Sequence, residues 1–174
     1  HVPWLHYCMV SVISVIGECK VSEELKGLLT DIKVDTQYLI TQKDRVTSKK
    51  SRVIAAHQQV VRYDRESTDE INNNSQMAIL EFFKAMVENY DVILLSDYGK
   101  GLLTFDLTQS LINISNENKK KLLVDPKGLD YSKYHGAFLL TPNKKEASEA
   151  TKTIINDNKS LIFAIKDLKK QCDL

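Results

Sequence analysis

The sequence has few of the features that would place a protein in a specialised class. It contains three cysteines, Cys8, Cys19 and Cys172, which lie far apart and form no CxxC pair. This spacing suits neither a disulfide framework nor a zinc site, and it favours a reducing compartment. No apolar run reaches the length of a membrane span, and residues 1–10 lack the basic region and cleavage site of a signal peptide. We therefore expect a cytoplasmic protein with no membrane partner.

The sequence also has little net charge. Its 24 lysines and arginines nearly balance 23 aspartates and glutamates, which gives a formal net charge of +1. A large positive excess would indicate nucleic acid as the main partner, so we expect none. The hydrophobic content of 43% and the length of 174 residues are sufficient for one globular domain with its own core.

Strand and helix patterns alternate along the chain. Val10 to Gly17 is rich in β-branched residues and predicts a short buried strand. Ser22, followed by two glutamates, predicts the N-cap of a helix. Further strands are predicted at 34–40, 51–56 and 60–64, with a turn at 57–59 between the last two.

From residue 69 onward the helical spacing becomes regular. Apolar residues from Ile79 to Val87 predict a helix that leads into a strand at Val92. Strands near 122 and 138 then alternate with helices near 107–112, from 143 and at 160–170. Such alternation is typical of βαβ units, so we expect a doubly wound, mostly parallel α/β sheet with helices on both faces.

Three of the predicted strands end in polar, glycine-containing or proline-containing segments. These are Ser96 to Gly101 (SDYGKG), Asp125 to Gly128 (DPKG) and Thr141 to Glu146 (TPNKKE). In open α/β sheets, anionic ligands bind where the carboxyl ends of the strands carry such groups. We therefore expect an anion-binding site at this edge of the sheet.

Each segment also has a simpler interpretation. Asn143 and Glu146 share one face of a helix start, where they could hold a phosphate and a magnesium-bound water, but they also fit an ordinary helix cap. Lys127 could neutralise a transferring phosphoryl group, although a turn with a solvated lysine explains the same residues. Two glycines around Lys100 indicate close approach of a ligand to the backbone, and the Walker spacing is absent.

Taken together, the three segments resemble the ribokinase-like (PfkB) carbohydrate kinases. Lys50 to Asp64 is similar to the lid strands of that family, and the likeness is greatest to kinases of D-glycero-β-D-manno-heptose 7-phosphate, which serve ADP-heptose synthesis for lipopolysaccharide core. The resemblance covers roughly residues 10–151. It implies one partial domain over 1–174, with lid-type strands at about 34–65 and an α/β core at about 10–31 and 69–174.

The resemblance also implies roles for individual residues, with ATP and Mg²⁺ as cofactors. It places Asp125, Lys127, Asn143 and Glu146 at the ATP phosphates, with Mg²⁺ held by Glu146 and Asn143 through water. It places Arg52, Gln58, Asp97 and Lys100 near the sugar phosphate. Lid strands of the family often pair between subunits, so a homodimer through this region is expected.

Two segments of the family are absent from the sequence. A Gly-Gly-x-x-Asn segment would bind the sugar, and a Gly-Ala-Gly-Asp segment would supply the aspartate that deprotonates the sugar hydroxyl. No catalytic base is therefore assigned, and the chain alone is expected to have little or no kinase activity. Two alternatives stay open: a catalytically inactive α/β module that binds a nucleotide or a partner, and a kinase for another sugar.

Overall fold

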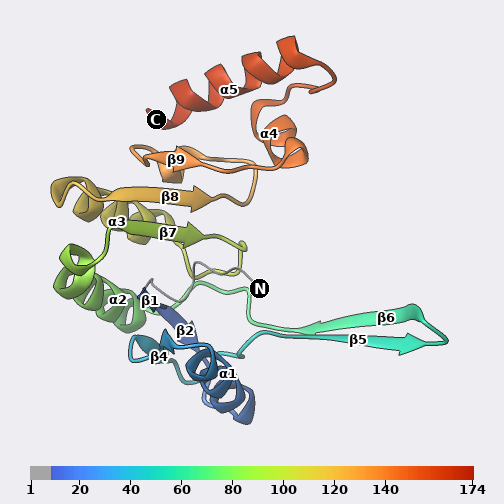
Figure 1. Cartoon of the computed structure of the whole chain (residues 1–174), viewed down its shortest axis with the longest axis vertical. Coiled ribbons are helices and arrows are strands. Elements are labelled where there is room, and N and C mark those ends of the chain that lie inside the picture. The colour runs from blue at the N-terminus through green and yellow to red at the C-terminus, as the bar shows by residue number, and fades with distance from the viewer. Residues whose placement is uncertain (1–8) are drawn as a thin grey trace. The chain divides into compact units, whose positions relative to one another are not determined.

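The computed structural model describes residues 9–174, so the predictions that concern residues 1–8, including Cys8, lie outside the described residues. The contacts of the chain divide it into two compact units, one ending at Ile79 and the other running from Leu80 to Leu174. Figure 1 shows the elements of both. Helix α2 (Asn73–Met86), followed by the 3-10 turn η2 (Val87–Asn89), contains the boundary between the units.

The first unit is built on two parallel strand pairs connected through α1 (Lys20–Asp31). Strand β1 (Val10–Ser11) pairs with β3 (Val34–Asp35), and β2 (Ser14–Ile16) pairs with β4 (Leu39–Thr41). The strand predicted from Val10 to Gly17 is thus present but interrupted. Only its second part is deeply buried, with Ile16 3% exposed.

The prediction that Ser22 caps the first helix is wrong. The helix begins at Lys20 with Cys19 as its N-cap, so Ser22 lies inside the first turn. The reason is a tertiary one: the buried Ser22 hydroxyl donates a hydrogen bond to the carbonyl of Gly17 and lies 2.8 Å from Oγ1 of Thr47. These partners hold Ser22 in the interior, where it cannot serve as a cap.

The first unit also contains a long antiparallel hairpin. Strands β5 (Lys49–Ala55) and β6 (Gln58–Arg65) are joined by a two-residue turn in which Ala56 and His57 have φ of 47° and 65°. The sequence predicts the turn at 57–59, but Gln58 and Gln59 belong to β6. Only residues 49–65 of the expected lid region are antiparallel, since β3 and β4 pair in parallel with β1 and β2.

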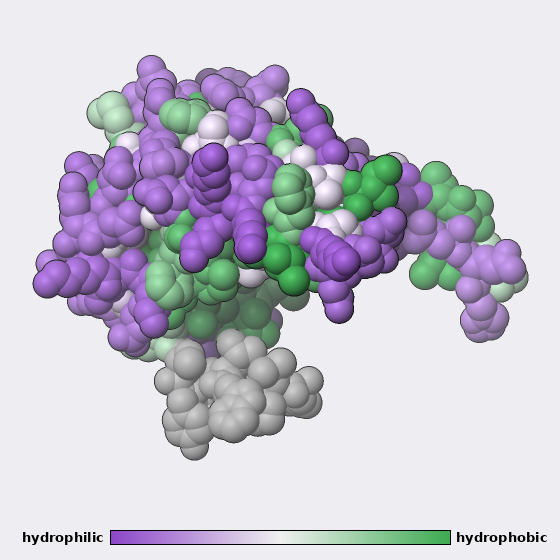
Figure 2. Space-filling model, turned by 90° about the horizontal axis from the view of Figure 1, so that it is seen from above, coloured by the Kyte–Doolittle hydropathy of each residue, from purple (hydrophilic) through white to green (hydrophobic). Residues whose placement is uncertain are grey.

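The hairpin exposes much of its apolar surface. Figure 2 shows hydrophobic residues on the part that projects at the right, which is the hairpin of Figure 1. Its large exposed side chains are Val53, Ile54, Val60, Val61 and Tyr63. A two-stranded hairpin alone is only marginally stable in water, so this surface is suited to contact with another surface.

The second unit contains a parallel sheet in the order β7 (Val92–Ser96), β8 (Lys121–Asp125) and β9 (Leu139–Leu140). Helix α3 (Phe105–Glu117) packs against β8 and against the 3-10 turn η3 (Ser132–Tyr134). Its Leu107 and Ile112, together with Leu122 and Val124 of β8, are at most 1% exposed and form the centre of the core. Helices α4 (Lys144–Thr151) and α5 (Asn158–Cys172) pack on each other beyond β9 (Figure 1).

Two features that the sequence argues against, a membrane span and a disulfide framework, concern residues that the structure describes. Across residues 9–174, no helix is both long and apolar enough to cross a bilayer. Cys19 and Cys172 are both free thiols, the first exposed and the second buried.

Candidate active site

The three polar segments meet at one edge of the sheet in the second unit. Ser96 of β7 lies opposite Asp125 of β8, and Val124 lies opposite Leu140 of β9. Because these strands are parallel and in step, the residues that follow them emerge at the same edge. The sequence therefore brings together Asp97, Lys127 and the start of α4.

Asn143 and Glu146 form a reciprocal capping box at the start of α4. The Asn143 side-chain oxygen accepts a hydrogen bond of 3.0 Å from the Glu146 amide, and Oε2 of Glu146 accepts one of 3.0 Å from the Asn143 amide. The pair therefore forms the helix cap that is the simpler interpretation of its spacing. It leaves the other carboxylate oxygen of Glu146 for a second contact.

That second contact is with Lys127. Its ammonium donates to Oε1 of Glu146 at 3.0 Å, across 19 residues of sequence. The hydrogen bond and the charge of Glu146 raise the pKa of Lys127. The Asn143 amide, and then Lys127, hold the pKa of Glu146 below its usual range. The lysine side chain is 52% exposed, so its remaining donors are accessible to an anion.

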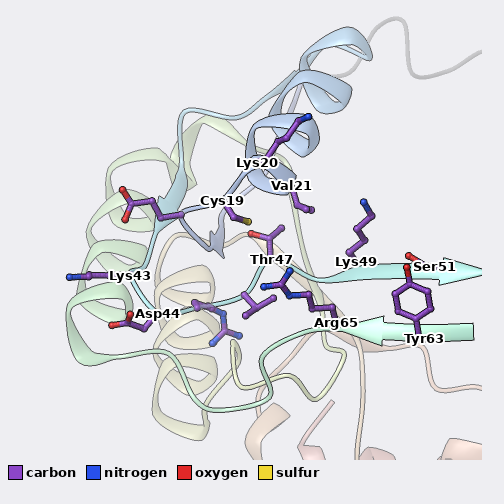
Figure 3. A pocket seen from close by; sticks show the side chains of 13 residues that line it. Cys19, Lys20, Val21, Lys43, Asp44, Thr47, Lys49, Ser51, Tyr63 and Arg65 are labelled. Atoms are coloured by element: carbon purple, nitrogen blue, oxygen red, sulfur yellow. The ribbon is translucent and has the colours of Figure 1, made fainter.

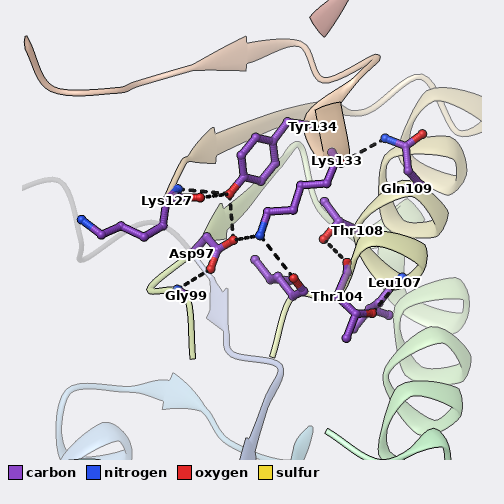
Figure 4. A network of polar contacts seen from close by, with 10 residues as sticks. Asp97, Gly99, Thr104, Leu107, Thr108, Gln109, Lys127, Lys133 and Tyr134 are labelled. Carbon is purple, nitrogen blue, oxygen red and sulfur yellow. Dashed lines mark hydrogen bonds and ion pairs between the residues drawn. The ribbon is translucent and has the colours of Figure 1, made fainter. Parts of the chain in front are cut away.

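Asp97 is buried and fully engaged by protein groups (Figure 4). Oδ2 accepts from the Lys133 ammonium at 2.6 Å and from the Tyr134 hydroxyl at 2.7 Å, while Oδ1 accepts from the Gly99 amide at 2.7 Å. Burial raises the pKa of Tyr134, so its hydroxyl stays protonated and can donate. The same hydroxyl accepts from the Lys127 amide at 3.0 Å, so this network positions the backbone of Lys127.

A cavity of about 560 Å³ opens beside this network. Lys127, Lys133 and the glycines at 99 and 128 line it, along with Tyr98, Phe105, Leu129, Asp130 and Ser132. Gly99 and Gly128 have φ of 64° and 99°, so the loops follow paths that other residues adopt only with strain. Lys100 belongs to the first of these loops but does not line the cavity.

The remaining predicted site residues have fewer contacts. Asp125 is exposed at the end of β8, and its carbonyl accepts the Asp97 amide at 2.9 Å. Arg52 and Gln58 are exposed on the hairpin of the first unit, where Arg52 lies directly opposite Arg62. Like charges directly opposite each other across strands are destabilising. Arg62 has a carboxylate partner of its own, because its Nη2 lies 3.2 Å from Oδ2 of Asp64.

The oxygen atoms at the sheet edge fit a magnesium ion that is held through its bound waters. Among the residues described, no group of three or more histidine, cysteine, aspartate or glutamate side chains is gathered to hold a metal. Mg²⁺ commonly keeps several waters and binds through one or two carboxylates together with substrate phosphates. Glu146 keeps lone pairs beyond the two used by Lys127 and Asn143, so it can contact such waters.

A family model described as pfkB family carbohydrate kinase matches residues 4–173. The chain belongs to the pfkB family of carbohydrate kinases. Among the relatives of this pfkB chain, the bifunctional protein HldE of Aliarcobacter butzleri (strain RM4018) is 58% identical over 165 residues. The protein of that name from Sulfurimonas denitrificans is 51% identical over 165 residues. Both matches cover 95% of this chain and 35% of the relative, so the chain spans about a third of the length of these relatives.

Solved structures of low sequence identity share the fold of this pfkB chain. Arabidopsis thaliana ribokinase complexed with ribose and ATP has a TM-score of 0.69 at 12% identity, over 94% of this chain and 52% of that one. The tetrameric inhibited form of phosphofructokinase-2 from Escherichia coli has a TM-score of 0.66 at 16% identity, over 94% and 54%. The predicted ribokinase-like α/β fold is therefore confirmed.

Sequence reasoning missed the two residues of this pfkB chain that anchor Asp97. Lys133 and Tyr134 lie in a single 3-10 turn and follow Asp97 by 36 and 37 residues. Nothing in their local pattern marks them, because a lysine beside a tyrosine is common in surface turns. Their role follows only from the parallel order of the strands, which carries η3 back to the end of β7.

Proposed function

We propose that the chain is part of a cytoplasmic sugar kinase that transfers the γ-phosphate of ATP, with Mg²⁺, to D-glycero-β-D-manno-heptose 7-phosphate. The observation that carries this proposal is the Lys127 ammonium held 3.0 Å from Glu146 at the edge where three parallel strands end. Membership of the pfkB family supports the kinase chemistry. The likeness of Lys50 to Asp64 to a heptose-kinase lid supports the sugar.

In this proposal the residues at the edge neutralise and orient, which is most of what phosphoryl transfer requires from a protein. Lys127 offsets the charge that develops on the transferring group, while the Asp97 network fixes the Lys127 backbone. Glu146 and Asn143 orient water on Mg²⁺. The ion supplies further charge neutralisation at the phosphates when it is bound.

Arg52 would contact the phosphate already present on the sugar. Among the described residues, Arg52 forms no ion pair, whereas Arg62, directly opposite, is paired with Asp64 at 3.2 Å. Arg52 is therefore the guanidinium that would be available to a phosphate. Asp125, Gln58 and Lys100 keep their proposed places around the two substrates. The Asp97 carboxylate is taken up by Lys133, Tyr134 and Gly99, so Asp97 would act by positioning the loops and not by contact with the sugar. No residue of this sequence is assigned as the base that deprotonates the sugar hydroxyl.

A chimeric enzyme tests the proposal. This chain would replace the matching 165 residues of the Aliarcobacter butzleri relative, to which it is 58% identical. ADP formation would then be measured with Mg²⁺ and either heptose 7-phosphate or fructose 6-phosphate. We expect turnover that depends on the heptose phosphate, and a loss in kcat of the order of 10²-fold for Lys127→Gln.

Lys144→Gln serves as the matched control, since Lys144 is an exposed lysine of the same edge outside the Lys127–Glu146 contact. Its kcat should stay within about twofold, as is usual for surface substitutions. A folded chimera that binds ATP without turning over either sugar would favour the inactive binding module. Preference for fructose 6-phosphate would instead overturn the assignment of the sugar alone.

We also propose that the hairpin pairs between two copies of the chain. The exposed apolar side chains of β5 and β6, such as Ile54 (66% exposed) and Val60 (65% exposed), support this assembly. Light scattering should give twice the mass of the chain at micromolar concentration, and Ile54→Lys with Val60→Lys should return it to one copy. A monomer at high concentration would contradict the proposal.

A further inference from the structure

The first unit contains a cavity of about 660 Å³ at the base of the hairpin, and every residue lining it belongs to that unit (Figure 3). Two loops form it: the turn from β2 into α1, and the loop between β4 and β5. The Gly17 amide donates to Oγ1 of Thr47 at 2.8 Å, and the Ser22 hydroxyl connects both residues. The cavity is therefore held open by buried hydrogen bonds, and its walls are largely preformed.

Gly17 makes this junction possible. A Cβ at this position would lie 1.9 Å from the carbonyl oxygen of Arg45, so only glycine allows the two loops to approach so closely. Arg45 lines the cavity as well, and its Nη1 donates to the Asp69 carbonyl at 3.0 Å. Two segments separated by about thirty residues are thus fixed relative to each other inside one unit.

Positive charge dominates the lining of the cavity. Five basic residues, Lys20, Lys43, Arg45, Lys49 and Arg65, face two acidic ones, Glu18 and Asp44. In Figure 3, Lys43 and Asp44 point away from the hairpin, whereas Arg65 extends from β6 toward Thr47. Among the described residues, Lys20, Lys49 and Arg65 form no ion pair, so their charges are not neutralised.

The register of the hairpin separates this cavity from the face that carries Arg52. Lys49 pairs with Arg65, and Ser51 with Tyr63, and all four line the cavity. Because side chains alternate along a strand, Arg52 lies on the opposite face. The cavity is therefore not the sugar-phosphate site of the proposed function.

The start of α1 adds further donors. Its N-cap, Cys19, makes no side-chain capping hydrogen bond, so the positive end of a twelve-residue helix faces the cavity. Hydrogen bonds of Ser22, from its side chain and then from its backbone amide, lower the pKa of Cys19 to about 7. The guanidinium of Arg65 offers the paired donors that match phosphate oxygens.

We propose that this cavity binds a small phosphorylated molecule, with its phosphoryl group held by Lys20, Lys49 and Arg65. The volume lies within the range of small-molecule sites. Tyr63 provides an aromatic ring at the rim for the remainder of the ligand. Such a molecule would be a second ligand, distinct from both substrates of the proposed kinase.

The test is a titration of the 174-residue chain with inorganic pyrophosphate, followed through the amide chemical shifts of Val21, Ser22 and Thr47. We expect saturable shifts, and at least tenfold weaker binding for Lys20→Gln with Lys49→Gln. Lys26→Gln with Lys50→Gln is the matched control, since it removes the same charge from the same two elements at positions outside the cavity. The control should leave the dissociation constant within about twofold, as is usual for surface substitutions.

Three results would overturn the proposal. The first is an absence of saturable shifts at these amides. The second is equal weakening by both pairs of substitutions, which would indicate diffuse attraction to a basic surface. The third is equal affinity for citrate, which would assign the site to carboxylates. Because the readout is local to the first unit, failure of the kinase proposal would leave it unaffected.

Discussion

Replacing Asp97 by alanine should destabilise the second unit more than any other change at the sheet edge. The carboxylate is 4% exposed and accepts hydrogen bonds from Lys133, Tyr134 and Gly99 at 2.6 to 2.7 Å. Removing one partner of a buried ion pair costs about 3–5 kcal/mol, because the other charge is left unpaired. Asp97→Ala leaves the Lys133 ammonium without its carboxylate partner.

Two features place the cost at the lower end of this range. Lys133 is 21% exposed and can gain some water, and the Tyr134 hydroxyl can turn to the Lys127 carbonyl at 3.2 Å. We therefore expect a loss of about 3 kcal/mol, equivalent to roughly a hundredfold larger opening equilibrium. Asp97→Asn should cost less, about 1–2 kcal/mol, because one oxygen can still accept.

Native-state amide hydrogen exchange of Leu122 and Val124 measures this loss within the second unit alone. The control is Asp125→Ala, because Asp125 ends the neighbouring strand and its exposed side chain has no hydrogen-bond partner among residues 9–174. Its effect should stay within about 0.5 kcal/mol. If both alanine variants change exchange equally, the reasoning that Asp97 anchors this edge is refuted.

Three further changes test other contacts. Gly17→Ala should lower the free energy of unfolding by about 1–3 kcal/mol in urea titrations, because its Cβ would meet the Arg45 carbonyl at 1.9 Å, and an unchanged midpoint would contradict the close approach. Alkylation of Cys19 by iodoacetamide, followed by peptide mass spectrometry, should reach half its maximal rate near pH 7 rather than near the ordinary thiol pKa of 9.0, because the thiolate reacts and forms at lower pH. Ser22→Ala should move that midpoint upward, and a midpoint near 9 in the unaltered chain would exclude the effect. Tyr134→Phe should cost about 1–3 kcal/mol by amide exchange, since Asp97 loses a donor, and full retention of protection would show that water replaces it.

Much of the fold could be predicted from local pattern. The apolar runs at Val92 and Leu122 are recognisable because a strand buried by parallel pairing is apolar nearly throughout. Helix starts were less predictable. Serine is a better cap than cysteine by local rules, yet Ser22 is held inside the helix by Thr47, 25 residues away, and no local rule contains that contact.

In the candidate site, too, some contacts could be predicted from the sequence and others could not. The capping box of Asn143 and Glu146 depends on a spacing of three residues, which the sequence displays directly. The contact between Lys127 and Glu146 could be anticipated once β8 and β9 were taken as neighbours. The anchoring of Asp97 by Lys133 could not, because it depends on how far the connection after β8 folds back.

The carboxylate of Glu146 has a consequence for how metal and phosphate affect each other's binding. It fixes Lys127 in place, yet an anion that approaches the ammonium also approaches the negative charge 3.0 Å away. A divalent cation between the two negative groups would turn this repulsion into attraction. Metal and phosphate should therefore bind cooperatively, each raising the affinity for the other by the same factor. A phosphate affinity that is independent of magnesium concentration would contradict this linkage.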